Sequence, residues 1–153
     1  MQRLDDVQAR EVTLAAVGAI NRRDHRWSIE AVRCLASDER LRMVAIDTCA
    51  AILLRGVPRG SLDPSVRIPV SVPAAPGEEI PAQAAEVASE VLSGMACGDD
   101  GRVVVALGVL SEEQRFDALL VLVRAAAAWI DTYVGIDGDT VDAYYAISKA
   151  ETT

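Results

Sequence analysis

The sequence predicts an all-α fold of six to seven helices, organised as a tandem duplication of a three-helix unit. Apolar residues recur at helical spacing on both sides of residues 56–81, every proline lies within that stretch, and capping residues precede several apolar segments. Because proline inside a helix removes a hydrogen bond and clashes with the preceding turn, it collects where the chain is not helical. We therefore expect a first unit at 1–56, a Pro-rich linker at 57–80, and a second unit with a C-terminal helix at 81–153, packed as one globular domain.

The first unit opens with a long helix and a short one. Residues Arg3–Arg22 contain no proline, and their apolar residues follow helical spacing, which predicts a helix. The polar stretch NRRDHRW then interrupts the pattern. Serine favours the N-cap position, so Ser28 is expected to start a short second helix over Ile29–Ala36.

The third helix is predicted by its start and its stop. Ser37 is placed as an N-cap, and Asp38 and Glu39 put negative charge in the first turn, where the helix dipole favours it. The apolar pattern continues to about Arg55, and Gly56 is typical of the residue that ends a helix. The helix is therefore expected from Asp38 to Arg55.

The second unit repeats this plan. Pro81 suits the first turn of a helix that runs to the CGDDG break. The segment Arg102–Leu110 contains VVVAL, which has strand propensity, but an isolated strand would have no partner, so a short helix is expected there. Ser111 and Gln114 form a capping box, which predicts a long helix over 112–134.

The residues after the long helix predict a final short helix. Asp139 is placed to cap a helix that reaches about Ala150. The same stretch, DGDTVD, begins like a calcium-binding loop, but Val141 and Asp142 stand where that loop needs an oxygen ligand and a glycine. Capping is therefore the interpretation we keep, and no calcium site is expected.

The two units align when the chain is shifted by 75 residues, from Val7–Gly56 to Ala82–Asp131. QAREV then faces QAAEV, Asp24 faces Asp99, and the order of long, short and capped long helix is shared. The shared order predicts a tandem duplication, with the linker as the join.

The linker itself has a second pattern. Val66, Ile68, Val70 and Val72 alternate with other residues, which is typical of an extended segment with one apolar side. The linker is therefore expected either as a strap on the surface or as a mobile connection.

The charge of the chain excludes some partners. The formal net charge is −8, so phosphate backbones and anionic membranes are repelled and a basic partner is permitted. No signal peptide is expected at the N-terminus, and the apolar run Ala118–Ile130 is too short to cross a bilayer and contains Arg124. A cytoplasmic location is expected. Lys149 is the only lysine, and the Ala- and Arg-rich composition is typical of a GC-rich bacterial genome.

No catalytic, metal or cofactor-binding residues are predicted. His25 is the only histidine and stands in a charged break, where solvent exposure is expected. The three cysteines, Cys34, Cys49 and Cys97, are widely spaced and are expected as free, mostly buried thiols. Scattered carboxylate pairs without histidine do not form a metal site of the helical-bundle kind. No cofactor is therefore expected.

The helix over 112–134 predicts how the units pack. At 100° per residue it has two apolar faces, and its counterpart over 38–55 is also apolar nearly all round. The expected solution pairs these two helices at the centre of one chain. The rival solution buries the Leu122 and Trp129 face against a second copy. The candidate interface residues combine that face with the tyrosines near the C-terminus: Leu122, Trp129, Tyr133, Tyr144 and Tyr145.

These features favour a non-enzymatic helical binding or adaptor protein that acts through protein–protein contacts. The expected partner is another protein or a second copy of the chain, which would form a homodimer. Two alternatives remain open. One is a helical bundle that binds a small molecule between the two units, near Trp27 or Trp129. The other is an acidic mimic of nucleic acid that inhibits a nucleic-acid-binding protein.

Overall fold

The computed structural model describes residues 4–55, 57–58, 60–70, 72 and 80–133, and these form six α-helices and no strand. The predicted all-α fold is therefore confirmed. Several predicted features lie outside the described residues: Gly56, Pro73, Pro76, Val134, the final helix over 139–150, Tyr144 and Tyr145.

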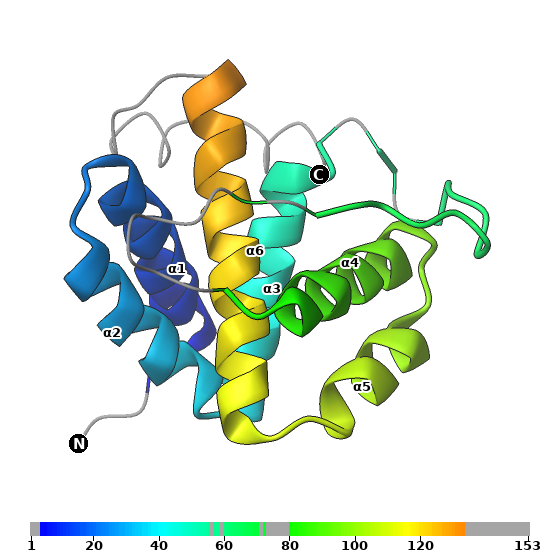
Figure 1. Cartoon of the computed structure of the whole chain (residues 1–153), viewed down its shortest axis with the longest axis horizontal. Coiled ribbons are helices and arrows are strands. Elements are labelled where there is room, and N and C mark those ends of the chain that lie inside the picture. Colours follow the sequence, from blue (N-terminus) through cyan, green and yellow to red (C-terminus); the bar gives the residue numbers. More distant parts are fainter. Residues whose placement is uncertain (1–3, 56, 59, 71, 73–79, 134–153) are drawn as a thin grey trace.

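The observed helices follow the predicted order (Figure 1). Their bounds are α1 Asp6–Asn21, α2 His25–Ala36, α3 Glu39–Leu53, α4 Ala82–Ala96, α5 Asp100–Gly108 and α6 Glu112–Tyr133.

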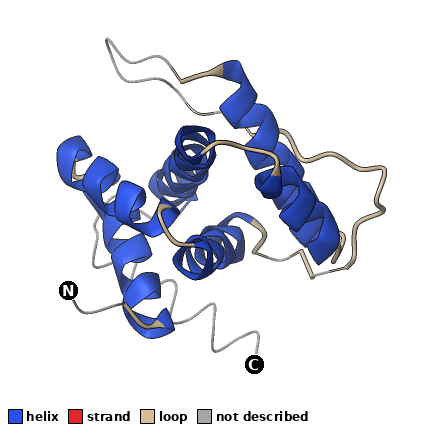
Figure 2. Ribbon diagram, turned by 90° about the horizontal axis from the view of Figure 1, so that it is seen from below, coloured by secondary structure: helices blue, strands red, loops and turns tan. Residues whose placement is uncertain are grey.

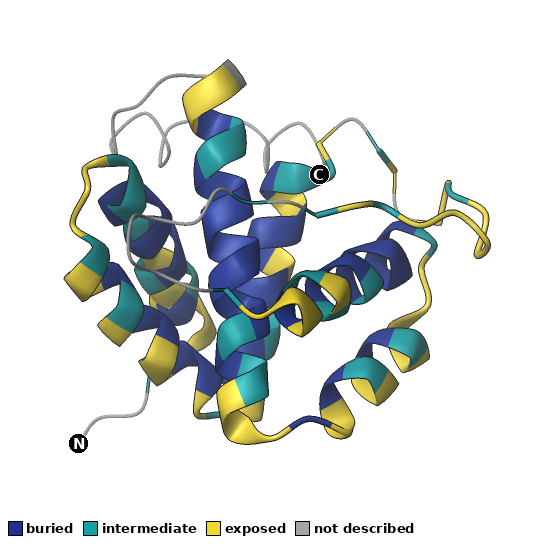
Figure 3. Cartoon of the chain, in the orientation of Figure 1, coloured by how far each residue is buried: buried dark blue, intermediate teal, exposed yellow. Residues whose placement is uncertain are grey.

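The centre of the molecule is the pair α3 and α6, as the two apolar faces of these helices predicted. They pack against each other, and α6 also contacts α1, α2 and α4. Figure 2 views the bundle from below, with the other helices placed around this pair. Val121, Val123 and Ile130 of α6 are fully buried, so the helix is enclosed along most of its length (Figure 3). Burial on several sides at once accounts for its two apolar faces.

The start of α2 corrects the sequence prediction. Asp24, not Ser28, is the N-cap, and its carboxylate accepts from the Trp27 amide at 3.4 Å. The helix therefore begins at His25, within the stretch that the sequence suggested as a break. Ser28 is buried inside the helix, and its hydroxyl donates to the carbonyl oxygen of Ala16 on α1 at 3.1 Å. It ties two helices together instead of starting one.

The start of α3 is shifted in the same way. Asp38 is the N-cap, with its carboxylate accepting from the amides of Arg40 and Leu41, whereas Ser37 ends α2. At α6 the prediction is confirmed: Ser111 Oγ accepts from the Gln114 amide at 3.2 Å, and the Gln114 side chain accepts from the Ser111 amide at 2.9 Å.

The turns α1–α2 and α4–α5 have the same backbone. Asp24 N donates to Ala19 O at 2.8 Å, and Asp99 N donates to Gly94 O at 2.8 Å, at the same 75-residue offset. The residues just before these aspartates, Arg23 and Gly98, are the only described pair at that offset with positive φ, at 64° and 78°. Each turn is then closed by the aspartate, which caps the next helix.

The described part of the proline stretch forms an extended strap along α4. Two serines of α4 hold one residue of the strap: Ile68 N donates to Ser93 Oγ at 2.8 Å, and Ser89 Oγ donates to Ile68 O. Ile68, Val70 and Val72 are partly buried against the core, whereas Val66 is exposed. The predicted alternation is thus present in three of its four positions.

Candidate interaction surface

Helix α5 leaves large apolar side chains in solvent. Val104, Val105 and Val109 are 57%, 67% and 80% exposed, and Gly108 beside them is also exposed (Figure 3). We call these four residues the valine face. They fall at positions i, i+1, i+4 and i+5, which lie on one side of a helix. Val103, on the other side, is buried.

The buried side of α5 packs on α4 at close range. A Cβ at Gly94 of α4 would lie 3.0 Å from Cγ2 of Val103, so a larger residue there would require that valine to shift. Leu107 completes the buried side. The side of α5 that faces α4 is therefore closely packed, and the valine face is the side that does not take part in this contact.

An ion pair fixes the orientation of α5. Arg102 Nη2 donates to Glu90 Oε2 of α4 at 3.1 Å, Arg102 Nε donates to Glu90 Oε1, and Arg102 Nη1 donates to Pro64 O of the strap at 3.2 Å. The hydrogen bonds from Arg102 lower the pKa of Glu90, although burial acts in the opposite direction. Two planar groups joined through two bonds hold a fixed geometry. The valine face is therefore presented in one direction.

Carboxylates stand at both ends of the valine face. Asp99 and Asp100 precede it and Glu112 and Glu113 follow it, and all four residues are exposed. Asp99 also caps α5 by accepting from the Arg102 amide at 3.0 Å. The face is thus an apolar stripe with an acidic rim.

Two arginines lie near the rim. Arg115 Nε donates to Leu107 O at 2.9 Å and its Nη2 donates to Gly108 O at 3.4 Å, so it compensates the carbonyl end of α5. Arg33 donates to Glu113 at 3.2 Å. Arg33 therefore offsets Glu113, whereas Arg115 is directed at backbone carbonyls.

At the 75-residue offset the valine face corresponds to Ile29, Glu30, Arg33 and Cys34 of α2, two of which are charged. At the 75-residue offset, Val105 corresponds to Glu30 and Gly101 corresponds to Arg26. Arg26 Nε and Glu30 Oε1 lie 3.6 Å apart in an exposed ion pair. Such a pair is typical of a helix face that stays in water. Where α2 has this exposed ion pair, α5 therefore has Gly101 and Val105.

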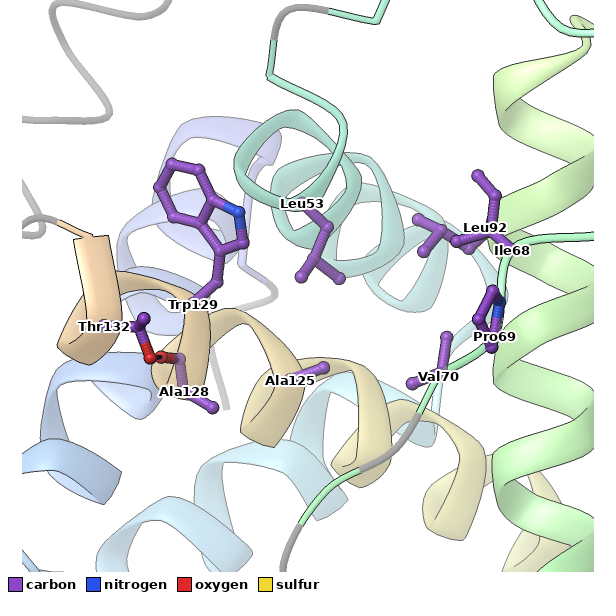
Figure 4. A pocket seen from close by; sticks show the side chains of 9 residues that line it. All are labelled: Leu53, Ile68, Pro69, Val70, Leu92, Ala125, Ala128, Trp129 and Thr132. Atoms are coloured by element: carbon purple, nitrogen blue, oxygen red, sulfur yellow. Dashed lines mark hydrogen bonds between the residues drawn. The ribbon is translucent and has the colours of Figure 1, made fainter.

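A second apolar feature is an open pocket of about 340 Å³ between α3, α4, α6 and the strap. Figure 4 shows Trp129 and Leu53 on one side and Ile68, Pro69 and Val70 of the strap on the other. Thr132 and the indole N–H of Trp129 contribute polar groups to its lining, and the Thr132 hydroxyl donates to Ala128 O at 2.9 Å. The lining residues are Leu53, Ile68, Pro69, Val70, Leu92, Ala125, Ala128, Trp129 and Thr132.

Of the candidate interface residues of the sequence, the structure describes the side chains of Leu122 and Trp129. Leu122 is 2% exposed and belongs to the core of the single chain. Trp129 is partly buried and lines the pocket. Tyr133 is the last residue of α6, and its side chain, like Tyr144 and Tyr145, lies outside the described residues.

The valine face was missed, although the sequence contains its signal. Once VVVAL is assigned to a helix, neighbouring residues point about 100° apart, so three consecutive valines cannot all face one core. The exposed members of the segment are Val104 and Val105.

The groups considered for chemistry are dispersed. His25 is partly buried as the first residue of α2, which corrects the expected solvent exposure. Among the cysteines, Cys34 is exposed, Cys97 is intermediate and Cys49 is buried, so the expectation of mostly buried thiols is wrong. No group of three metal-ligating side chains occurs within the described residues. Among the described helices, none combines the length and apolar character that crossing a membrane requires.

Comparison with known proteins gives no relative. No family model, no curated protein and no solved structure matches the chain.

Proposed function

We propose that the chain is a non-enzymatic helical binding protein that contacts a protein partner through the valine face. The observation that carries this proposal is the exposure of three neighbouring valines, Val104, Val105 and Val109, on a helix whose other side is well packed. Exposed apolar groups that cluster on one element are typical of interaction sites. Their exposure adds nothing to the stability of the single chain.

We also propose that the scaffold arose by tandem duplication, with units at 1–56 and 81–153 and the strap as the join. The shared turn, with positive φ at Arg23 and Gly98 and an aspartate cap after each, supports it. The two units have diverged in packing: α2 packs on α1, α3 and α6, whereas α5 packs mainly on α4. This difference frees one helix of the second unit for a partner.

The proposal is tested by capture of a partner with matched variants. Val104→Glu changes the valine face, and Val7→Glu makes the same substitution at a second valine that is also 57% exposed. Partner capture from a native extract is expected to be lost in Val104→Glu and kept in Val7→Glu, with unchanged circular dichroism in both. Equal capture by both variants contradicts the proposal.

A second candidate function rests on the pocket beside Trp129. Its lining side chains are mostly apolar, which suits a small molecule with a large hydrophobic part, as expected for ligand sites between helices. Trp129 fluorescence in a Trp27→Phe background would report binding, and native mass spectrometry would reveal a ligand that co-purifies. If the fluorescence spectrum of Trp129 does not change when hydrophobic probes are added, this candidate function is wrong.

A further inference from the structure

We infer that the partner segment on the valine face is a basic amphipathic helix, with apolar residues at i, i+3, i+4 and i+7 and Lys or Arg at both of its ends. The inference rests on the proposed function and names the chemistry of its partner. It follows from the shape of the face, the charge at its two ends and the contrast with α2.

The shape of the face favours a helix as the occupant. Val104 and Val105 lie one turn from Gly108 and Val109, so the exposed stripe runs along the axis of α5. Nothing lies within 4 Å of a Cβ built at Gly108, which leaves a shallow position between the valines. An apolar ridge of a second helix fits such a position, because small residues let two helices approach closely.

The charge at the two ends determines what must flank that ridge. Asp99 and Asp100 stand at the amino end of α5, and Glu112 and Glu113 stand just beyond its carboxyl end. Complementary charge on the partner gives specificity and a faster association rate. Both ends of the partner helix are therefore expected to be positive, whichever direction it runs.

A second copy of the chain fits this surface poorly. Two α5 helices packed in either orientation would bring acidic ends together, and each copy carries a formal net charge of −8. α5 has 9 residues, which is about 13 Å of helix. A stable interface needs about 800 Å² from each partner, more than such a short pair supplies. A longer partner that reaches past both ends of α5 adds contact area beyond this helix.

The first unit supplies an internal reference for the inference. In α2 the places of Gly101 and Val105 are filled by the exposed ion pair Arg26–Glu30. Glycine in a helix costs about 1 kcal/mol relative to alanine, and an exposed valine gains little from folding. The second unit thus carries residues that are unfavourable for the isolated helix and favourable for close packing against another one.

The test uses three synthetic 18-residue helical peptides with the same leucine positions and with lysine, glutamine or glutamate at both ends. Fluorescence polarisation with the full chain is expected to give the lowest Kd for the lysine peptide, about tenfold or more below the glutamine peptide. Its Kd is expected to rise from 50 to 500 mM salt in this assay, because salt screens exposed charges. The glutamate peptide is expected not to bind.

Variants of the chain separate the apolar contribution from the acidic one. Val105→Gln with Val109→Gln removes apolar surface without adding charge and is expected to raise the Kd of the lysine peptide at least tenfold, and Val7→Gln is expected to leave it unchanged. Asp100→Asn with Glu112→Gln is expected to raise the Kd of the lysine peptide several-fold and to leave the Kd of the glutamine peptide unchanged. A lysine peptide that binds the valine variant as tightly as the wild type overturns the inference, because its binding is then charge alone.

Other outcomes separate this inference from the proposed function. If Val104→Glu abolishes capture of a native partner but the three peptides bind alike, the face is an interaction site and the basic helix is wrong. If capture and peptide binding are both insensitive to the valines, both fail. A wild-type dimer in light scattering that Val105→Glu makes monomeric would identify a second copy as the occupant and overturn the inference.

Discussion

Arg23 and Gly98 occupy the same position in two helix–helix turns, and both have a left-handed backbone, with φ of 64° and 78°. The hydrogen bonds around them also match, from Asp24 N to Ala19 O and from Asp99 N to Gly94 O, each at 2.8 Å. A left-handed conformation costs an ordinary residue about 1–2 kcal/mol, whereas glycine adopts it freely. The second turn has glycine at this left-handed position, which the geometry favours, whereas the first turn has arginine.

Arg23→Gly is therefore expected to stabilise the chain by up to about 1 kcal/mol, because strain relief exceeds the greater entropy of glycine in the unfolded state. Gly98→Ala is expected to destabilise it by about 1–2 kcal/mol. Its Cβ would also lie 3.3 Å from the Cα of Gly60. Urea denaturation of both variants measures these changes, and a destabilised Arg23→Gly would argue against the shared turn.

Gly94 and Gly108 lie in helices and are expected to respond to alanine in opposite directions. Gly94→Ala places a methyl group 3.0 Å from the buried Val103, and the strain is expected to exceed the gain in helix propensity and lower stability by about 1 kcal/mol. Gly108→Ala meets nothing within 4 Å and is expected to raise stability by up to about 1 kcal/mol. Thermal unfolding of the two variants measures the difference, and equal shifts would contradict the close packing of α4 and α5.

The helices could be predicted because periodicity and capping act locally. The Ser111 and Gln114 capping box needs only four neighbouring residues, and it was predicted correctly. Ser28 was assigned wrongly because its partner, Ala16, comes from another helix. A serine's preference for caps is a local tendency, and a buried hydrogen bond between helices overrides it.

The buried thiol Cys49 makes stability depend on pH in the alkaline range. Burial raises its pKa to about 12, whereas an unfolded thiol titrates near 8.5. Because the folded chain holds the proton more tightly, the stabilisation is fully present below about pH 8.5 and is lost as the pH rises toward 12. The titration of Cys49 therefore adds a slope to the dependence of the free energy of unfolding on pH, and this extra slope is at most about 1.4 kcal/mol per pH unit.

Urea denaturation at pH 8, 9 and 10 tests this against Cys49→Ala, which is expected to remove the extra slope. A thiol reagent on the native wild type is expected to modify the exposed Cys34 first and Cys49 only after unfolding. Identical slopes in wild type and variant would mean that Cys49 is accessible to water in the folded chain.

Leu122 separates a core position from an interface position. It is 2% exposed within one chain, so Leu122→Ala is expected to lower the free energy of unfolding by about 2–5 kcal/mol. Light scattering is expected to give the same mass for wild type and variant. A mass that halves in the variant would place Leu122 in a homodimer contact instead.

The surface was harder to predict than the core. Periodicity identifies which helix faces are apolar, but it does not say which of them another helix covers. Both α2 and α5 were expected as equivalent short helices, yet α2 contacts three helices and α5 mainly one. The exposure of Val105 therefore follows from tertiary packing, which a single sequence does not contain.

Both backbone groups of Ile68 attach the strap to α4, and this attachment is open to a direct test. Ser93 Oγ accepts from Ile68 N at 2.8 Å, and Ser89 Oγ donates to Ile68 O, so two hydroxyls pair both backbone groups of that residue. Arg67, next to it, donates to Ser89 Oγ at 3.4 Å. These contacts replace the strand partner that an extended segment otherwise lacks.

Ser89→Ala with Ser93→Ala is therefore expected to lower stability by about 1–3 kcal/mol, because both backbone groups of Ile68 lose a partner. Trypsin is expected to cut after Arg67 several times faster than in the wild type. Thr48→Ala is the control, since Thr48 Oγ1 donates to Val44 O of its own helix at 2.8 Å. If the double variant and Thr48→Ala are cut after Arg67 at the same rate, the two serines do not hold the strap.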